Sequence, residues 1–230
     1  MVYLLYQLQD VSLSKGGKEI LKNININIAN GDRVSVIGPS GSGKSSLLRL
    51  LSSLDSPSSG RILYMGEDIE HKEPMEYRKK VRYVFQKPYL FGSTVRDNLT
   101  FCYNLEKCEP NYDRIYYLMD RFNIPYEFLD KSRDSLSGGE QQRIALVRSL
   151  LVEPEVLLLD EVTASLDFAN SLLVEEYMIE LNEEKGITAI LVTHDMDQAK
   201  RWGGDTIYLE EGKTKYYMPT EKLFNEHKED

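Results

Sequence analysis

The stretch of sequence that decides the fold reads Gly38-Pro39-Ser40-Gly41-Ser42-Gly43-Lys44-Ser45. It follows the short apolar run 34–37 and precedes the segment 45–54, in which leucines recur at helical spacing. A glycine-rich turn between a strand and a helix leaves backbone N–H groups that face an anion, and the helix dipole adds to the attraction. The stretch therefore predicts a phosphate-binding loop.

Two side chains of this loop indicate that the anion is ATP with its metal. In the pattern G-x-x-x-x-G-K-[ST], Lys44 is expected to reach the β- and γ-phosphates, and the Ser45 hydroxyl is expected to ligate Mg²⁺. The alternative is an ordinary Gly/Ser turn, which matches this pattern by chance in roughly one per cent of chains of this length. The residues expected to bind ATP are Gly38, Pro39, Ser40, Gly41, Ser42, Gly43, Lys44, Ser45 and Ser46.

A second glycine-rich stretch, Ser137-Gly138-Gly139-Glu140-Gln141-Gln142-Arg143, lies later in the chain. It also reads as the start of a helix, but it has no lysine and no evident metal ligand at the turn. One triphosphate needs only one such cradle. The chain therefore either binds two anions or contributes opposite halves of a shared site.

Length and composition narrow the class of protein. The 230 residues, 41% hydrophobic and 28% charged, suit one large globular domain or a domain with a subdomain. The net charge of −9 disfavours nucleic acid as a partner. The chain has no apolar run of about 20 residues, the length that spans a bilayer, and its start lacks the features of a signal peptide. We therefore expect a cytoplasmic protein in which Cys102 and Cys108 are free thiols.

The pattern of apolar residues predicts an α/β fold. Residues 1–30 alternate between apolar and polar, which indicates antiparallel strands with one solvated face. Continuous apolar runs alternate with helical segments, which favours a mainly parallel sheet covered on both faces. Residues 87–135 read as a mostly helical insert, and the tail from Glu210 as a short strand and helix. The runs expected to be buried strands are 34–37, 81–86, 156–159, 187–193 and 206–209, and the expected helices are 45–54, 140–151 and 170–184.

Four polar residues stand at the ends of expected strands, where ligands bind in α/β sheets. Asp160 is expected to hold Mg²⁺, and Glu161 to act as the general base that polarises an attacking water. His194 is expected to contact the γ-phosphate, and Gln86 to reach the Mg²⁺ or the attacking water. The alternatives are a solvated acidic pair and a structural histidine.

These motifs, in this order and spacing, resemble the ATP-binding cassette of ABC transporters. The resemblance implies a P-loop NTPase (RecA-like) core within one ATPase domain, 1–230. Its parts would be an antiparallel β part (1–30 and 61–76), a nucleotide-binding core (31–60, 77–86 and 140–230) and a helical signature subdomain (87–139). The residues that carry the resemblance are Gly38–Ser45, Gln86, 136–140, 156–161, 165–167 and His194.

The resemblance also answers the question of the two glycine-rich stretches, because it implies a homodimer that forms on ATP binding. Gln86 would be the Q-loop residue and His194 the switch histidine. A membrane permease subunit would contact 87–135, which would place the protein on the inner face of the cell membrane. The residues implied to hold the partner's ATP are Ser137, Gly138, Gly139 and Glu140, and the D-loop at the dimer interface would be Ser165, Leu166 and Asp167.

One position departs from the family pattern, and a further similarity suggests a subfamily. Lys15 stands where an aromatic residue commonly stacks on adenine, so base selectivity is expected to be relaxed. The stretch 85–99, Thr163 and the stretch 194–197 are similar to Fet-type iron-export ATPases. The alternatives are an importer ATPase of the phosphate or amino-acid type and a non-transport ATPase of the superfamily.

Overall fold

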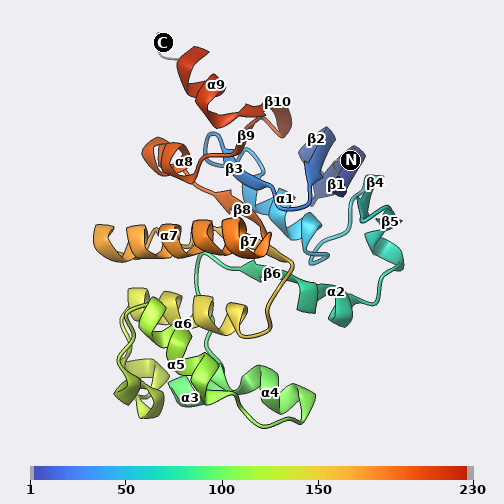
Figure 1. The fold of residues 1–230 in the computed structure, drawn as a ribbon. Helices are drawn as coiled ribbons and strands as arrows, with labels where there is room; N and C mark the ends of the chain where they lie inside the picture. The colour runs from blue at the N-terminus through green and yellow to red at the C-terminus, as the bar shows by residue number, and fades with distance from the viewer. Residues whose placement is uncertain (1–2, 227–230) are drawn as a thin grey trace. The chain divides into compact units, whose positions relative to one another are not determined.

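The computed structural model describes residues 3–226 (Figure 1). The chain forms two compact units. Unit 1 comprises Met1–Tyr83, Glu155–Asp160 and Ile179–Asp230, and unit 2 comprises Val84–Pro154 and Glu161–Met178. The end of the expected tail, 227–230, lies outside the described residues.

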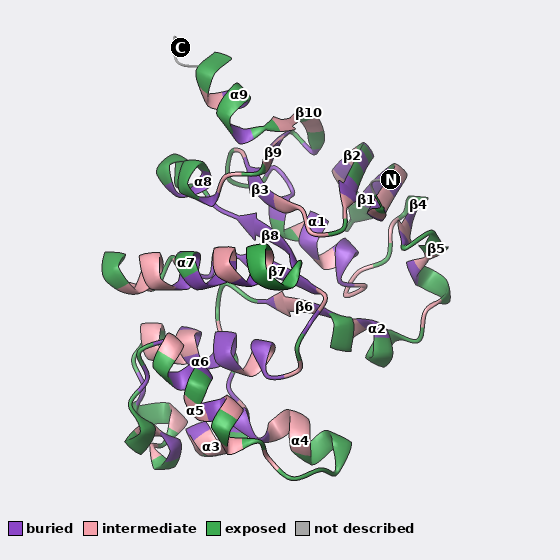
Figure 2. Cartoon of the chain, in the orientation of Figure 1, coloured by how far each residue is buried: buried purple, intermediate pink, exposed green. Residues whose placement is uncertain are grey.

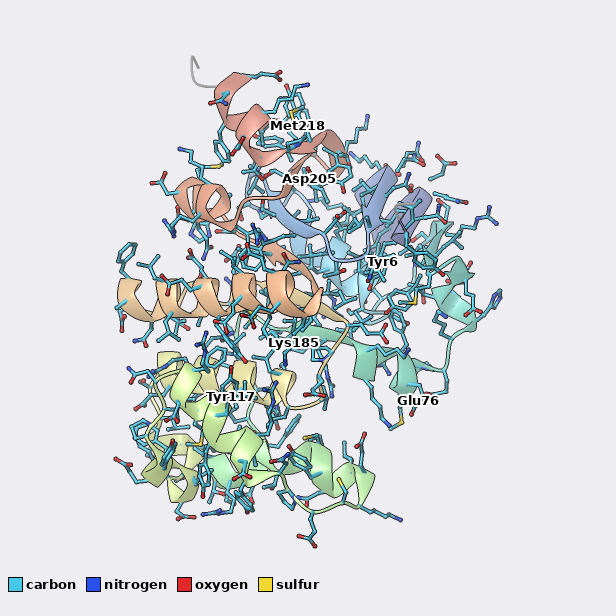
Figure 3. The ribbon with its side chains drawn as sticks, viewed as in Figure 1. Tyr6, Glu76, Tyr117, Lys185, Asp205 and Met218 are labelled. Carbon is cyan, nitrogen blue, oxygen red and sulfur yellow. The ribbon has the colours of Figure 1, made fainter. Side chains whose placement is uncertain are left out.

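The antiparallel sheet of unit 1 contains its four strands in the order β2-β1-β4-β5. The alternation expected for its first two strands is present, since Ile24, Ile26 and Ile28 are buried and the intervening asparagines are exposed. Tyr6, labelled in Figure 3, is fully buried, and its hydroxyl donates to the Leu51 carbonyl oxygen at 3.2 Å. The strands are β1 (Leu4–Lys15), β2 (Lys18–Ala29), β4 (Ser59–Tyr64) and β5 (Glu67–Asp68).

The second sheet has six strands in the order β10-β9-β3-β8-β7-β6. β3 pairs in parallel with β8 and β9, β7 pairs in parallel with β8, and β10 pairs antiparallel to β9. β7 and β8 are buried along their whole length, as their purple colour in Figure 2 shows. The expected mixed, mainly parallel sheet is therefore confirmed. The strands are β3 (Arg33–Ile37), β6 (Val81–Val84), β7 (Val156–Asp160), β8 (Thr188–Val192), β9 (Asp205–Glu210) and β10 (Lys213–Pro219).

Helix α1 joins the two sheets of unit 1 into one core. Its leucines are buried in the same hydrophobic cluster as residues from β1, β2, β3, β7, β8 and β9. The short helices α2 and α8 were not expected from the sequence, and each is capped by an acidic side chain, Glu73 and Asp195. The helices of this unit are α1 (Lys44–Leu51), η1 (Ile69–His71), α2 (Pro74–Lys80), α8 (Met196–Trp202) and α9 (Thr220–Glu226).

Unit 2 is helical, as the segment 87–135 predicts. It also contains α6, a helix that we expected to belong to the nucleotide-binding core. Arg143 of α6 donates to the carbonyl oxygens of Phe122 and Asn123, which ties this helix to the end of α5. None of the helices within 3–226 combines the length and the apolar character needed to cross a bilayer. The helices of the unit are α3 (Val95–Leu99), α4 (Phe101–Glu106), α5 (Tyr112–Arg121), η2 (Tyr126–Asp130), η3 (Arg133–Ser135), α6 (Gly138–Leu150) and the first part of α7 (Phe168–Lys185).

Candidate functional site

The first glycine-rich loop leads from β3 into α1, as its sequence predicts. Three of its glycines have positive φ angles, 139° at Gly38, 78° at Gly41 and 104° at Gly43. A Cβ atom at Gly38 would lie 2.0 Å from the Leu209 carbonyl oxygen, and one at Gly43 would lie 2.6 Å from the Leu21 Cδ2. The path of this loop therefore requires glycine at both ends.

The middle of the loop offers a place for a phosphate group. The Ser42 Oγ is buried and has no hydrogen-bond partner among the described residues, and a Cβ at Gly41 would meet open space. The Lys44 Nζ donates to the carbonyl oxygens of Gly38 and Pro39, at 2.9 Å each. An unpaired donor beside a lysine and a helix N-terminus fits an anion, because a buried polar group without a partner is costly. The loop thus fits the phosphates of ATP.

Ser45 and Asp160 are 115 residues apart in the chain and lie in contact. The Ser45 Oγ donates to the Asp160 Oδ1 at 2.9 Å, and the carboxylate is 6% exposed at the end of β7. A hydroxyl and a carboxylate are hard oxygen ligands of the kind that Mg²⁺ prefers. These two residues fit the ion that their sequence positions predict.

Tyr83 is a residue of this cluster that the sequence analysis missed. Its hydroxyl donates to the Asp160 Oδ2 at 2.5 Å. Burial raises the pKa of Tyr83 well above its usual range, and the hydrogen bond and charge of Asp160 raise it further, so the phenol stays protonated and acts as a donor. The only sequence signal was a tyrosine in β6, among residues that otherwise read as a core strand.

The register of the parallel strands places the expected strand-end residues at one edge. Asp160 pairs with Val192, and Val192 pairs with Val36, just before the phosphate loop. The Thr193 backbone N–H donates to the Val36 carbonyl oxygen at 3.2 Å, and His194 follows with its side chain exposed. His194 thus follows β8 next to the end of β3, the strand that leads into the phosphate loop.

Lys15 lies at the end of β1 with its ammonium group in an ion pair. Its Nζ is 2.6 Å from the Asp55 Oδ2, and the same oxygen accepts from the Arg49 Nε at 2.7 Å. The Arg49 hydrogen bond holds the pKa of Asp55 below its usual value, with a smaller contribution from Lys15, although burial opposes both. The charged end of Lys15 is thereby fixed, and its aliphatic stem is the part left to cover a base.

Gln86 and Glu161 are brought together in unit 2. The Gln86 Nε2 donates to the Glu161 Oε2 at 2.6 Å. Glu161 has a φ angle of 47°, which lies in the left-handed region that non-glycine residues seldom adopt. Such local strain persists where the surrounding structure fixes it, and it often marks functional residues. Both features fit the expected role of Glu161 as general base.

The second glycine-rich stretch begins α6, as expected. Ser137 and Glu140 form a capping box: the Ser137 backbone N–H donates to the Glu140 Oε2 at 2.6 Å, and the Glu140 N–H donates to the Ser137 Oγ at 3.3 Å. The Lys131 Nζ lies 3.2 Å from the Glu140 Oε1. Burial raises the pKa of Glu140, but the Ser137 hydrogen bonds and Lys131 lower it by more. Glu140 is thus engaged in holding the helix start, whereas Gly138 is exposed.

The structure places the expected D-loop against this helix start. A Cβ at Gly139 would lie 3.1 Å from the Ser165 carbonyl oxygen and 3.3 Å from the Leu166 Cδ2. A side chain at this position would push the 165–166 backbone and the Leu166 side chain away by a few tenths of an ångström. Asp167 follows and accepts from the Asn170 backbone and side-chain amides, at 2.9 and 2.7 Å.

Comparison with known proteins extends over nearly all of the chain. A family model described as ABC transporter matches residues 21–164. The chain is 43% identical over 194 residues to the Probable iron export ATP-binding protein FetA of Escherichia coli (strain K12), covering 84% of this chain and 86% of that protein. It is 40% identical over 185 residues to ABC transporter I family member 17 of Arabidopsis thaliana, covering 80% and 70%. It is 38% identical over 226 residues to the Spermidine/putrescine import ATP-binding protein PotA of Spiroplasma citri, covering 96% and 63%.

Two solved structures are also similar. One is cbiO1 from Clostridium perfringens, part of the ABC transporter complex cbiONQ, with a TM-score of 0.84 and 30% identity, covering 98% of this chain and 92% of that one. The other is a dimer of the ATP-binding cassette MJ0796 in a post-hydrolysis state bound to ADP and Pi, with a TM-score of 0.83 and 29% identity, covering 94% and 99%.

Proposed function

The chain belongs to the ABC transporter family, as one of its ATP-hydrolysing subunits, and from this premise we propose that it drives metal export, of iron foremost, through a separate membrane permease. One contact is the main support for an ATP site. The Ser45 Oγ, at the end of the phosphate loop, lies 2.9 Å from the Asp160 Oδ1. This contact joins the two sequence motifs that ATP hydrolysis requires.

We propose that Gly38–Ser46 bind the ATP of their own chain. The Ser42 Oγ and the backbone N–H groups would donate to phosphate oxygens, and Lys44 would exchange its two carbonyl acceptors for the β- and γ-phosphates. Ser45 and Asp160, with Gln86, would hold Mg²⁺. When bound there, the ion would neutralise charge on the phosphates.

Hydrolysis would then depend on residues around the γ-phosphate. Glu161 would accept a proton from the attacking water, and Gln86 would orient that carboxylate through its 2.6 Å hydrogen bond. His194 would contact the γ-phosphate from the end of β8. These roles follow from residue type and position in the sheet.

We propose that the complete site needs two copies of the chain. The exposed start of α6 at Ser137–Gly139, with Glu140 bracing it, would hold the γ-phosphate of ATP on a partner subunit. The D-loop 165–167 would cross the interface. Because it packs on Gly139, a movement of the D-loop would be transmitted to the residues that hold the partner's phosphate. The dimeric form of the similar MJ0796 cassette supports this arrangement.

The proposal of export rests on the similarity to the Probable iron export ATP-binding protein FetA of Escherichia coli. The alternative is an importer ATPase, which the similarity to a spermidine/putrescine import protein favours. In either case the permease would contact the helical region 87–135, and the chain would be peripheral on the inner face of the membrane. Reconstitution with a permease subunit that binds the chain distinguishes the two candidate substrates. Stimulation of ATP hydrolysis by ferrous iron supports iron as the transported substrate, and stimulation only by a polyamine contradicts it.

Glu161→Gln tests the proposed hydrolytic site. The amide cannot accept the proton of water, so we expect ATP hydrolysis to fall about 100-fold or more while ATP binding is retained. With ATP and Mg²⁺ the variant should elute from a sizing column at twice its monomer mass. Hydrolysis at the wild-type rate would contradict the proposed base.

A further inference from the structure

We propose that Tyr83 is a positioning residue for the metal site, whose hydroxyl fixes the Asp160 carboxylate so that Oδ1 faces Ser45 and the ion that they would share. The inference rests on the Mg²⁺–ATP site proposed above. It adds a residue that no motif of the sequence indicates.

The geometry of Asp160 carries the inference. Its Oδ1 accepts from Ser45 at 2.9 Å and its Oδ2 accepts from Tyr83 at 2.5 Å. The two donors come from different elements, α1 and β6. The terminal torsion of an aspartate is broad, so one hydrogen bond leaves the carboxylate plane free to swing. Donors on both oxygens fix that plane, and a hydroxyl bonded to a carboxylate makes a strong, charge-assisted bond.

Packing explains why residue 83 has an aromatic ring, but it does not explain why that ring carries a hydroxyl. Tyr83 is half-buried and packs against the core of unit 1, which a phenylalanine would also do. The hydroxyl adds one strong contact, and that contact falls on the residue expected to hold the metal. The simpler alternative is a tyrosine that merely satisfies its own hydroxyl, as buried tyrosines usually do. The two explanations differ in what happens to metal binding when the hydroxyl is removed.

A second tyrosine–carboxylate pair in the same unit provides a matched control. The Tyr64 hydroxyl donates to the Glu155 Oε2 at 2.6 Å, and Glu155 immediately precedes β7, the strand that Asp160 ends. Tyr64→Phe therefore removes a bond of the same type and similar length at the opposite end of the same strand. Tyr83→Phe removes the bond to Asp160 and keeps the ring.

The measurement is the affinity for a non-hydrolysable ATP analogue, by calorimetry, once with Mg²⁺ and once with EDTA. In the wild type, Mg²⁺ should tighten binding. In Tyr83→Phe, the increase in affinity caused by Mg²⁺ should be roughly tenfold smaller. This is the low end of the effect found for residues that orient metal ligands. Binding in EDTA should be unchanged, because the hydroxyl that is removed donates to Asp160, and Asp160 is proposed to act through the metal. Tyr64→Phe should match the wild type in both conditions.

Each other outcome overturns the inference. If Mg²⁺ increases the affinity of Tyr83→Phe for the ATP analogue as much as it does in the wild type, Tyr83 does not position Asp160. The proposed function would be unaffected by that result. A loss shared by Tyr64→Phe, or weaker binding of Tyr83→Phe in EDTA, would show general loosening of unit 1 instead. A wild type that does not respond to Mg²⁺ would remove the proposed metal site, and the inference with it.

Discussion

Gln86 and Glu161 are 75 residues apart in the chain, and a hydrogen bond of 2.6 Å runs from the Gln86 Nε2 to the Glu161 Oε2. The bond holds the carboxylate proposed as general base in one orientation, on a residue whose backbone already has the unusual φ of 47°. The sequence predicts both residues at strand ends, with Gln86 reaching the Mg²⁺ or the attacking water. The structure adds a direct contact with the base.

Gln86→Ala should lower kcat for ATP hydrolysis by roughly tenfold, a part of what a general base contributes. The KM for ATP should change by less than kcat, because Ser45 and Asp160 remain to hold the Mg²⁺ while the contact with the proposed base is lost. Steady-state kinetics checks this, with Lys87→Ala as the neighbouring control. A rise in KM at constant kcat would contradict a role through Glu161.

Two glycines of the phosphate loop should respond differently to alanine. At Gly38 the added Cβ would meet the Leu209 carbonyl oxygen, so Gly38→Ala should destabilise unit 1 by about 3 kcal/mol or more. At Gly41 the Cβ would enter open space, so Gly41→Ala should cost only about 1 kcal/mol, from its positive φ. Urea unfolding gives both values.

The same pair separates folding from ATP binding. Gly41→Ala should stay folded yet bind ATP at least about tenfold more weakly, because the methyl group fills the space proposed for phosphate and an unpaired buried polar group then stays unpaired. Fluorescence titration with an ATP analogue measures this. Unchanged affinity in Gly41→Ala would show that phosphate lies elsewhere.

Lys15→Tyr should tighten ATP relative to GTP by roughly threefold or more, because an aromatic ring restores stacking on the base. Asp55 keeps its ion pair with Arg49 in this variant. Lys18→Tyr, on the facing residue of the β1–β2 hairpin, is the matched control. If the ratio of the ATP and GTP affinities is the same in all three proteins, Lys15 does not contact the base.

The capping box of α6 should make stability depend on pH. The pKa of Glu140 is lowered in the folded state, so its contribution is fully present above the ordinary value of 4.5 and is lost as pH falls through the lower folded value. Glu140→Gln should therefore be less stable than the wild type at pH 7, by roughly 1 kcal/mol, the usual value of a helix cap.

Denaturant unfolding at several pH values measures this difference. The gap between the wild type and Glu140→Gln should close as the pH is lowered below 4.5. Glu127→Gln, an exposed change in η2, should show no such gap. A gap that stayed constant down to low pH would mean that the charge of Glu140 does not stabilise the helix start.

The sequence predicted those features that depend on local patterns. The alternation around Ile26 gave the antiparallel strands, and the glycine spacing of 38–45 gave the phosphate loop with its helix. Both signals are local, because a strand face or a tight turn needs only a few neighbouring residues of the right kind.

Features that depend on contacts distant in sequence could not be predicted in this way. The Tyr83–Asp160 bond joins residues 77 apart, and the Lys15–Asp55 pair joins residues 40 apart. The polar helix α8 was also missed, since it is short and has too few apolar residues to show a helical period, although Asp195 marks its start. The place of α6 in unit 2 is set by the packing of Arg143 near α5, which no local pattern reports.

The central claim is that the two glycine-rich stretches belong to one ATP site built from two chains, and cross-linking tests it most directly. Both chains carry Cys102→Ser, Cys108→Ser and Glu161→Gln. One also carries Ser40→Cys and the other Ser137→Cys, at two exposed positions. The mixture is treated with a short bis-maleimide and run on a denaturing gel.

We predict a cross-linked dimer in the mixture that forms only when ATP is present, and none when the Ser137→Cys chain is treated alone. Absence of a cross-link in the mixture with ATP would contradict the claim. Cross-linking within a single chain that carries both cysteines would contradict it equally, because the two stretches would then serve one chain.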